Sequence, residues 1–104
     1  RRAMRDSLFR NSPFEDTLHQ WNSVRRGERL YIAPYRGQAN LTVDTFLPYE
    51  LCILMQHLTL RLQQNAQELA AADLAPLGAV LGQVAPIDYA DFLPEDSILH
   101  EFIG

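Results

Sequence analysis

The sequence contains no lysine, although nine of its 104 residues are basic, and all nine are arginines. It also lacks a glycine-rich loop that could cradle a phosphate group. A Gly-x-x-x-x-Gly-Lys-Ser/Thr loop needs both features, so the chain by itself cannot bind a nucleotide as P-loop enzymes do. Arginine carries a planar fork of donors that suits phosphate and carboxylate groups. A GC-rich coding sequence, which favours arginine codons, would produce the same bias without any function.

Metal-binding and disulfide-forming residues are also scarce. Cys52 is the one cysteine, which excludes an internal disulfide and a cysteine-based metal framework. His19, His57 and His100 lack the spacing of metal ligands, so we expect no metal site. No apolar run approaches the length of a membrane span. Since a low cysteine content is typical of cytoplasmic proteins, we expect a cytoplasmic protein without a membrane partner.

Positive charge is missing from most of the chain. Residues 1–36 carry eight arginines and four acids, whereas residues 37–104 carry one arginine and nine acids. The formal net charge is −4. An acidic chain without a long basic stripe is poorly suited to nucleic acid, so we expect no nucleic-acid partner. A chain of 104 residues is long enough for one modest hydrophobic core.

The N-terminal segment is predicted to form a short basic helix over residues 1–10. In such a helix Arg1, Arg5 and also Arg2 lie within about one turn of each other, so their guanidinium groups can converge on one anion. A solvent-exposed helix face without a ligand has the same spacing. From the spacing alone, the second interpretation is favoured over the first.

A second helix is predicted to begin at a capping box formed by Ser12 and Glu15, with Pro13 in its first turn. We expect Gly27 to end or loosen this helix. Its apolar face would consist of four side chains at helical spacing, Phe14, Leu18, Trp21 and Val24.

Residues 39–46 form the best predicted strand, because apolar and polar side chains alternate from Leu41 to Phe46. Residues 30–33, which precede Pro34, are also expected to be extended. A lone strand leaves its backbone donors and acceptors unpaired. We therefore expect its neighbours to come from a second copy or from sequence outside these 104 residues. On this interpretation the chain is a piece of a larger protein.

The second half of the chain is predicted to be helical. A long helix over residues 48–71 and a second over residues 74–84 should pack as an antiparallel pair, and a last helix should open at Pro94. The expected fold is α+β and mostly helical, with about five helices and one or two strands. We divide it into residues 1–47, with lid helices and the strand, and a helical region over residues 48–104.

Four blocks, in this order and spacing, resemble the C-terminal part of the uridine kinase-like P-loop kinases, the phosphoribulokinase/uridine kinase family. The likeness covers residues 1–55 well and 86–104 fairly. The blocks are RRAMRD at 1–6; the 17–21 helix with SVRRGE at 23–28; YIAP at 31–34 with the 39–46 strand and YEL at 49–51; and SILHEFIG at 97–104.

The resemblance implies specific roles for three arginines. Arg2 and Arg5 would belong to a lid that closes over the ATP phosphates, where they would act as catalytic residues by stabilising the transferring phosphoryl group. Arg10 would be a further candidate for binding the phosphates or the nucleoside. The parent would be a three-layer α/β kinase that uses ATP and Mg²⁺, phosphorylates a nucleoside-like alcohol and supplies the missing core as a partner. Neither ATP nor Mg²⁺ is expected to bind this chain alone.

The chain departs from the family pattern in two places, Thr42–Thr45 (TVDT), where an Asn-Ser is usual, and His100, where an arginine is usual. A second hypothesis needs no kinase at all. The leucine stripe from Leu51 to Leu62 and the unpaired strand at 39–46 would then form a non-catalytic interaction module that pairs with a second copy as a homodimer.

Overall fold

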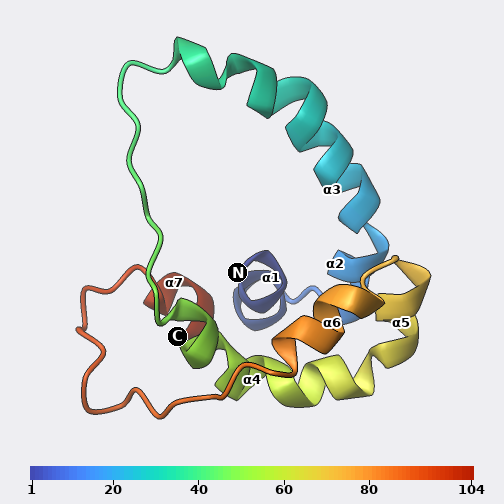
Figure 1. Cartoon of the computed structure of the whole chain (residues 1–104), viewed down its shortest axis with the longest axis vertical. Coiled ribbons are helices and arrows are strands. Elements are labelled where there is room, and N and C mark those ends of the chain that lie inside the picture. The colour runs from blue at the N-terminus through green and yellow to red at the C-terminus, as the bar shows by residue number, and fades with distance from the viewer.

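The computed structural model describes all 104 residues, and the chain is mostly helical, as the sequence predicts (Figure 1). It contains no β-strand. The first helix spans Arg2–Phe9, close to its predicted range of residues 1–10. The seven α-helices are α1 (Arg2–Phe9), α2 (Phe14–His19), α3 (Trp21–Gly27), α4 (Glu50–Gln64), α5 (Ala66–Ala71), α6 (Ala75–Leu81) and α7 (His100–Ile103).

A small hydrophobic core surrounds α1, which lies in the middle of the molecule between α2, α4 and α7 (Figure 1). Both predicted regions of the chain contribute to this core, with α1 and α2 from residues 1–47 and α4, α5 and α7 from residues 48–104. Its buried apolar residues are Met4, Phe14, Leu18, Ile53, Leu54, Met55, Leu58, Leu69, Leu99, Phe102 and Ile103.

A curved helical segment leads away from this core. It consists of α3, the π-helical turn η1 (Glu28–Ile32) and the 3₁₀ turn η2 (Ala33–Gln38), and an extended segment then returns to the start of α4 (Figure 1). Every residue from 28 to 46 is exposed. We call residues 28–46 the arm.

The strand predicted at residues 39–46 is not confirmed. The segment is extended at Ala39 (φ −70°, ψ 136°), but no other strand of the chain lies beside it to complete a ladder of hydrogen bonds. Near its end the Asp44 carboxylate instead accepts a local hydrogen bond from the Phe46 amide at 2.9 Å. Alternation of side chains favours an extended backbone, but a strand also requires a partner.

The α-helix ends at Gly27, as predicted, and the chain continues from there in the wider π-helical turn η1, with helical dihedral angles at Gly27 itself (φ −61°, ψ −44°). One prediction about the path into the arm is wrong. Residues 30–33 are helical rather than extended, since Ala33 has φ −57° and ψ −41° although Pro34 follows it. Pro34 is tolerated because it lies in the first turn of η2, where its missing amide hydrogen would have had no helical partner.

The predicted capping box is absent. Pro13 takes the N-cap position of α2, and no side chain caps that helix. The predicted helix is also divided at Gln20 into α2 and α3. Between α1 and α2, Asn11 has a positive φ of 49°. The Asp6 carbonyl accepts hydrogen bonds from both the Arg10 and the Ser12 amides, and α1 ends there.

The helices of the second half are shorter than predicted. The predicted 48–71 helix is divided at Asn65, whose side-chain amide donates to the Arg61 carbonyl at 2.8 Å and so takes an acceptor at the helix end. The last helix begins at His100 rather than at Pro94. Instead of close antiparallel packing, a hollow of about 390 Å³ separates α4 from α6. None of the helices combines the length and the apolarity that crossing a bilayer requires.

Candidate functional site

Three of the arginines singled out in the sequence converge on one carboxylate, that of Asp6. The nearest nitrogen–oxygen distances to Asp6 are 3.5 Å from Arg2, 3.6 Å from Arg5 and 3.4 Å from Arg10. Arg2 and Arg10 lie four residues before and after Asp6, a spacing that places side chains on one helical face. We call Arg2, Arg5, Asp6 and Arg10 the arginine cluster.

The arginine cluster carries more positive than negative charge, because three guanidinium groups surround a single carboxylate. The Asp6 side chain is only 11% exposed, whereas the side chains of Arg2 and Arg10 are 47% and 57% exposed. The distances of 3.4–3.6 Å are those of ion pairs rather than hydrogen bonds, and the buried Oδ1 of Asp6 and Nε of Arg5 have no hydrogen-bond partner. The guanidinium groups therefore keep free donors for a further anion.

A shallow, open depression of about 420 Å³ adjoins the arginine cluster, lined by Arg5, Phe9, Arg10, His100 and Glu101. The ring nitrogens of His100 lie 2.8 Å from the Gly104 carbonyl and 3.0 Å from the Pro94 carbonyl. Both contacts are hydrogen bonds only when both nitrogens carry a proton, since a carbonyl oxygen can only accept. The depression thus combines cationic groups with one acid and can accommodate a small anion.

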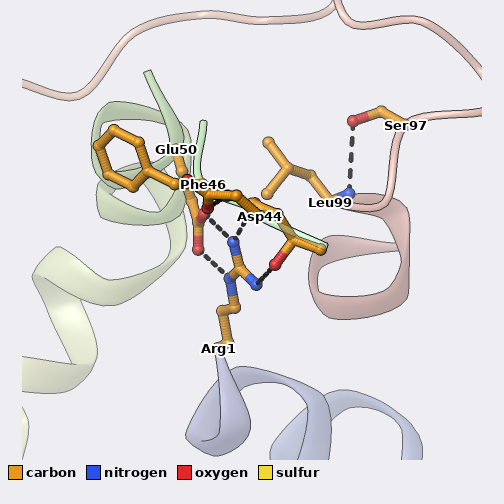
Figure 2. A network of polar contacts seen from close by, with 7 residues as sticks. Arg1, Asp44, Phe46, Glu50, Ser97 and Leu99 are labelled. Carbon is orange, nitrogen blue, oxygen red and sulfur yellow. Dashed lines mark hydrogen bonds and ion pairs between the residues drawn. The ribbon is translucent and has the colours of Figure 1, made fainter. Parts of the chain in front are cut away.

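Arg1 does not join the cluster, although its spacing allowed it to meet the same anion. Its guanidinium group forms a two-pronged ion pair with Glu50 at the start of α4 (Figure 2). It also donates to the Thr45 carbonyl at 3.0 Å and lies 5.5 Å from the centre of the Phe102 ring. The hydrogen bond to Glu50 raises the pKa of Arg1, more than burial lowers it. Arg1 therefore acts as a clasp between α1, α4, α7 and the end of the arm.

Sequence reasoning missed both partners of this clasp. The sequence indicates Glu50 only as part of a family motif and Thr45 only as a strand residue. Glu50 is 9% exposed and so is one of the few buried charged residues. The available signal was a lone acid beside the apolar run Leu51–Met55, because an acid among core residues needs a charged partner.

A second polar contact joins α4 to the loop that precedes α7. The Nε2 atom of His57 lies 2.8 Å from the Tyr89 hydroxyl, and both side chains are half-buried. Burial lowers the pKa of His57, and the nearby charge of Arg61 lowers it further. The folded state therefore favours neutral His57, whose Nε2 can accept a hydrogen bond from the Tyr89 hydroxyl.

We expect this contact to make the stability of the fold depend on pH. The pKa of His57 is lower in the folded than in the unfolded state. The contribution of His57 to the free energy of unfolding is therefore fully present above about pH 6.5, the ordinary pKa of histidine, and is lost as the pH falls below that value. Urea unfolding between pH 7.5 and 5 should show a loss of stability that His57→Gln reduces. If the stability of His57→Gln falls with pH as steeply as that of the unmodified chain, His57 is not the group responsible.

No group of three or more histidine, cysteine, aspartate or glutamate side chains is arranged to hold a metal ion. The largest group of charged side chains that the structure brings together is the arginine cluster. Comparisons with protein-family models, with curated proteins and with solved structures find no match for this chain.

Proposed function

We propose that the chain is the C-terminal portion of an ATP-dependent nucleoside kinase of the uridine kinase-like type. Arg2 and Arg5 stabilise the phosphoryl group during transfer, and Arg10 assists in binding the phosphates. The observation that carries the proposal is the convergence of Arg2, Arg5 and Arg10 around a single carboxylate. Phosphoryl transfer depends on such positioned positive charge because the transition state spreads negative charge over three oxygens.

Asp6 has a defined part in this proposal. Its carboxylate holds the three guanidinium groups near one another when no phosphate is bound, and it neutralises only one of their charges. A polyphosphate carries several charges, so it can compete for the exposed donors of Arg2 and Arg10. Guanidinium forks bind phosphate with two parallel hydrogen bonds, which also orients the group.

Other parts of the reaction must come from outside these 104 residues. ATP and Mg²⁺ would be held by a P-loop with its lysine, which this chain lacks. The Mg²⁺ ion would offset part of the negative charge of the phosphates. The arginine cluster would then close over phosphates that the rest of the parent kinase holds, and the chain alone would not be active.

The exposed arm is consistent with a chain that needs a large partner surface. The chain exposes 7599 Å², whereas a globular monomer of its mass exposes about 6,000 Å². Its radius of gyration is 15.1 Å, against about 13 Å for a compact chain of this length. In the proposed kinase, the remainder of the parent covers the apolar side chains of the arm.

The test is a phosphoryl-transfer assay on the full-length protein with ATP, Mg²⁺ and uridine, together with the coding sequence upstream of Arg1. We expect a Gly-x-x-x-x-Gly-Lys-Ser/Thr loop within one domain length and transfer of the terminal phosphate to the nucleoside. A start codon directly before Arg1, with no such loop, would rule the kinase out.

The exposed apolar residues of the arm favour a second candidate function, a homodimeric interaction module. The predicted stripe on α4 is largely used within the chain, since Met55 and Leu58 are buried in the core, so the arm would carry the interface. Its large exposed apolar residues are Leu30, Tyr31, Ile32, Tyr35, Leu41, Val43 and Phe46.

Light scattering on the chain tests this second candidate. A homodimer should have twice the 11.9 kDa mass of one chain, and the double variant Tyr31→Glu/Val43→Glu should return it to a monomer. Leu60→Glu adds one such charge at an exposed apolar position of α4 and should leave the dimer intact. A monomer at all concentrations in the unmodified chain would exclude the dimer.

A further inference from the structure

The helix α6 lies over the core without being part of it. None of its seven residues is buried, although leucines occupy several of its positions. Hollows lie on both sides of it. The outer hollow is the space of about 390 Å³ between α4 and α6, and the inner hollow of about 150 Å³ lies between α6 and helices α1 to α5. Leu62, Leu69 and Gly78 line both hollows.

The inner hollow is lined almost entirely by apolar side chains. Thr17 and the residues Arg1 and Arg2 at the start of α1 are its polar contributors. Three of its leucines come from α4 and α5, three from α6 and its N-terminal flank, and one from α2, and the only tryptophan of the chain, Trp21, completes the wall. The seven leucines are Leu18, Leu58, Leu62, Leu69, Leu74, Leu77 and Leu81.

We propose that the inner hollow is a binding site for a small, uncharged, apolar molecule about the size of one six-membered ring. An enclosed cavity of about 150 Å³ lined by aliphatic and aromatic side chains stays free of water and accepts benzene in a well-characterised protein. The inner hollow has a similar volume and lining, but it is partly open to solvent. The same lining offers an ordered water few partners, because a buried water needs two to four polar groups. An apolar ring instead gains contacts with leucine and tryptophan carbons.

The loose seating of α6 provides a route of entry. Leu77 and Val80 of this helix are 47% and 61% exposed. A short turn joins α6 to α5, whereas the long connection over residues 82–99 joins it to α7. An added Cβ atom at Gly78 would lie 3.5 Å from Leu69 Cδ1, an ordinary van der Waals contact. The glycine at position 78 therefore leaves open space next to both hollows that a larger side chain would enter.

Fluorescence of Trp21 tests the proposal directly, since iodobenzene carries a heavy atom that quenches a tryptophan it contacts. We expect quenching that saturates with iodobenzene concentration and that benzene displaces. Potassium iodide, which is too polar to enter, should quench only in linear proportion to its concentration. Benzene should also raise the Tm of the chain, because a ligand that binds only the folded state stabilises it.

Variants at two glycines separate occupancy of the hollow from general effects on helices. Gly78→Leu should abolish saturable quenching by filling the space. Gly78→Ala is the milder variant, and it should raise the Kd about fourfold, the factor for one displaced methyl contact. Gly27→Ala is the matched control, since a Cβ there meets nothing within 4 Å in an equally helical position, and its Kd should be unchanged.

Linear quenching by iodobenzene in the unmodified chain, together with no shift of Tm by benzene, would overturn the proposal. Equal Kd values for Gly78→Ala and Gly27→Ala would overturn the assignment to the inner hollow. Neither outcome depends on the proposed kinase activity, because both readouts are binding measurements on an uncharged ligand.

Discussion

Replacing both Arg2 and Arg5 by alanine in the proposed full-length kinase should lower kcat by about 10³-fold or more, the effect expected for arginines that stabilise phosphoryl transfer. KM for ATP should rise far less, because the loss falls on charge that develops in the transition state. The two side chains are 47% and 32% exposed, so their removal leaves no cavity in the core. The measurement is steady-state transfer of phosphate from ATP to uridine.

Two further variants show whether position or charge alone matters. The double variant Arg25→Ala/Arg26→Ala removes the same charge from exposed positions of α3 and should leave kcat within a fewfold of the original. The double variant Arg2→Lys/Arg5→Lys keeps the charge but loses the planar fork and should recover only part of the rate. Full activity in the alanine double variant would show that the lid assignment is wrong.

Replacing Arg1 by alanine should destabilise the fold by about 2–3 kcal/mol, near the lower end for breaking a buried ion pair. The loss arises mainly because Glu50, at 9% exposure, is left without a partner. The Arg1 side chain is 31% exposed, and access of water to it moderates the effect. Urea unfolding followed by circular dichroism measures the change.

The matched control for this prediction is Arg36→Ala, which removes an exposed arginine of the arm with no ion pair. Its stability should stay within about 0.5 kcal/mol of the original. Removing both partners with Arg1→Met/Glu50→Leu should recover most of the lost stability, since no buried charge then remains unpaired. An Arg1→Ala variant as stable as Arg36→Ala would refute the clasp.

The arginine cluster was predictable from sequence because it is local. Arg2, Asp6 and Arg10 are separated by four residues each, and helix geometry alone brings such positions together. The role of Asp6 at the centre of the cluster was not predicted, since the sequence was read for cations that meet an external anion. The neighbouring depression could not be predicted from the sequence either, because it forms only where α7 packs beside α1.

The errors in secondary structure have physical causes that lie outside the local pattern. A strand at 39–46 requires a neighbour to accept and donate its backbone hydrogen bonds, and the chain has none. The long helix was divided by a single side chain, Asn65, which bonds the carbonyl of Arg61. Neither a missing partner nor a side-chain cap of that kind is visible in hydrophobic periodicity.

The sequence by itself determined that this protein is mostly helical, that α1 carries a concentrated set of arginines, and that no lysine-dependent phosphate loop is present. These features follow from residue identity and from spacings of three and four. Only the tertiary structure decided that Arg1 binds Glu50, 49 residues away, that the arm is uncovered, and that α6 leaves a hollow. Such pairings depend on how distant segments pack, and no local spacing encodes them.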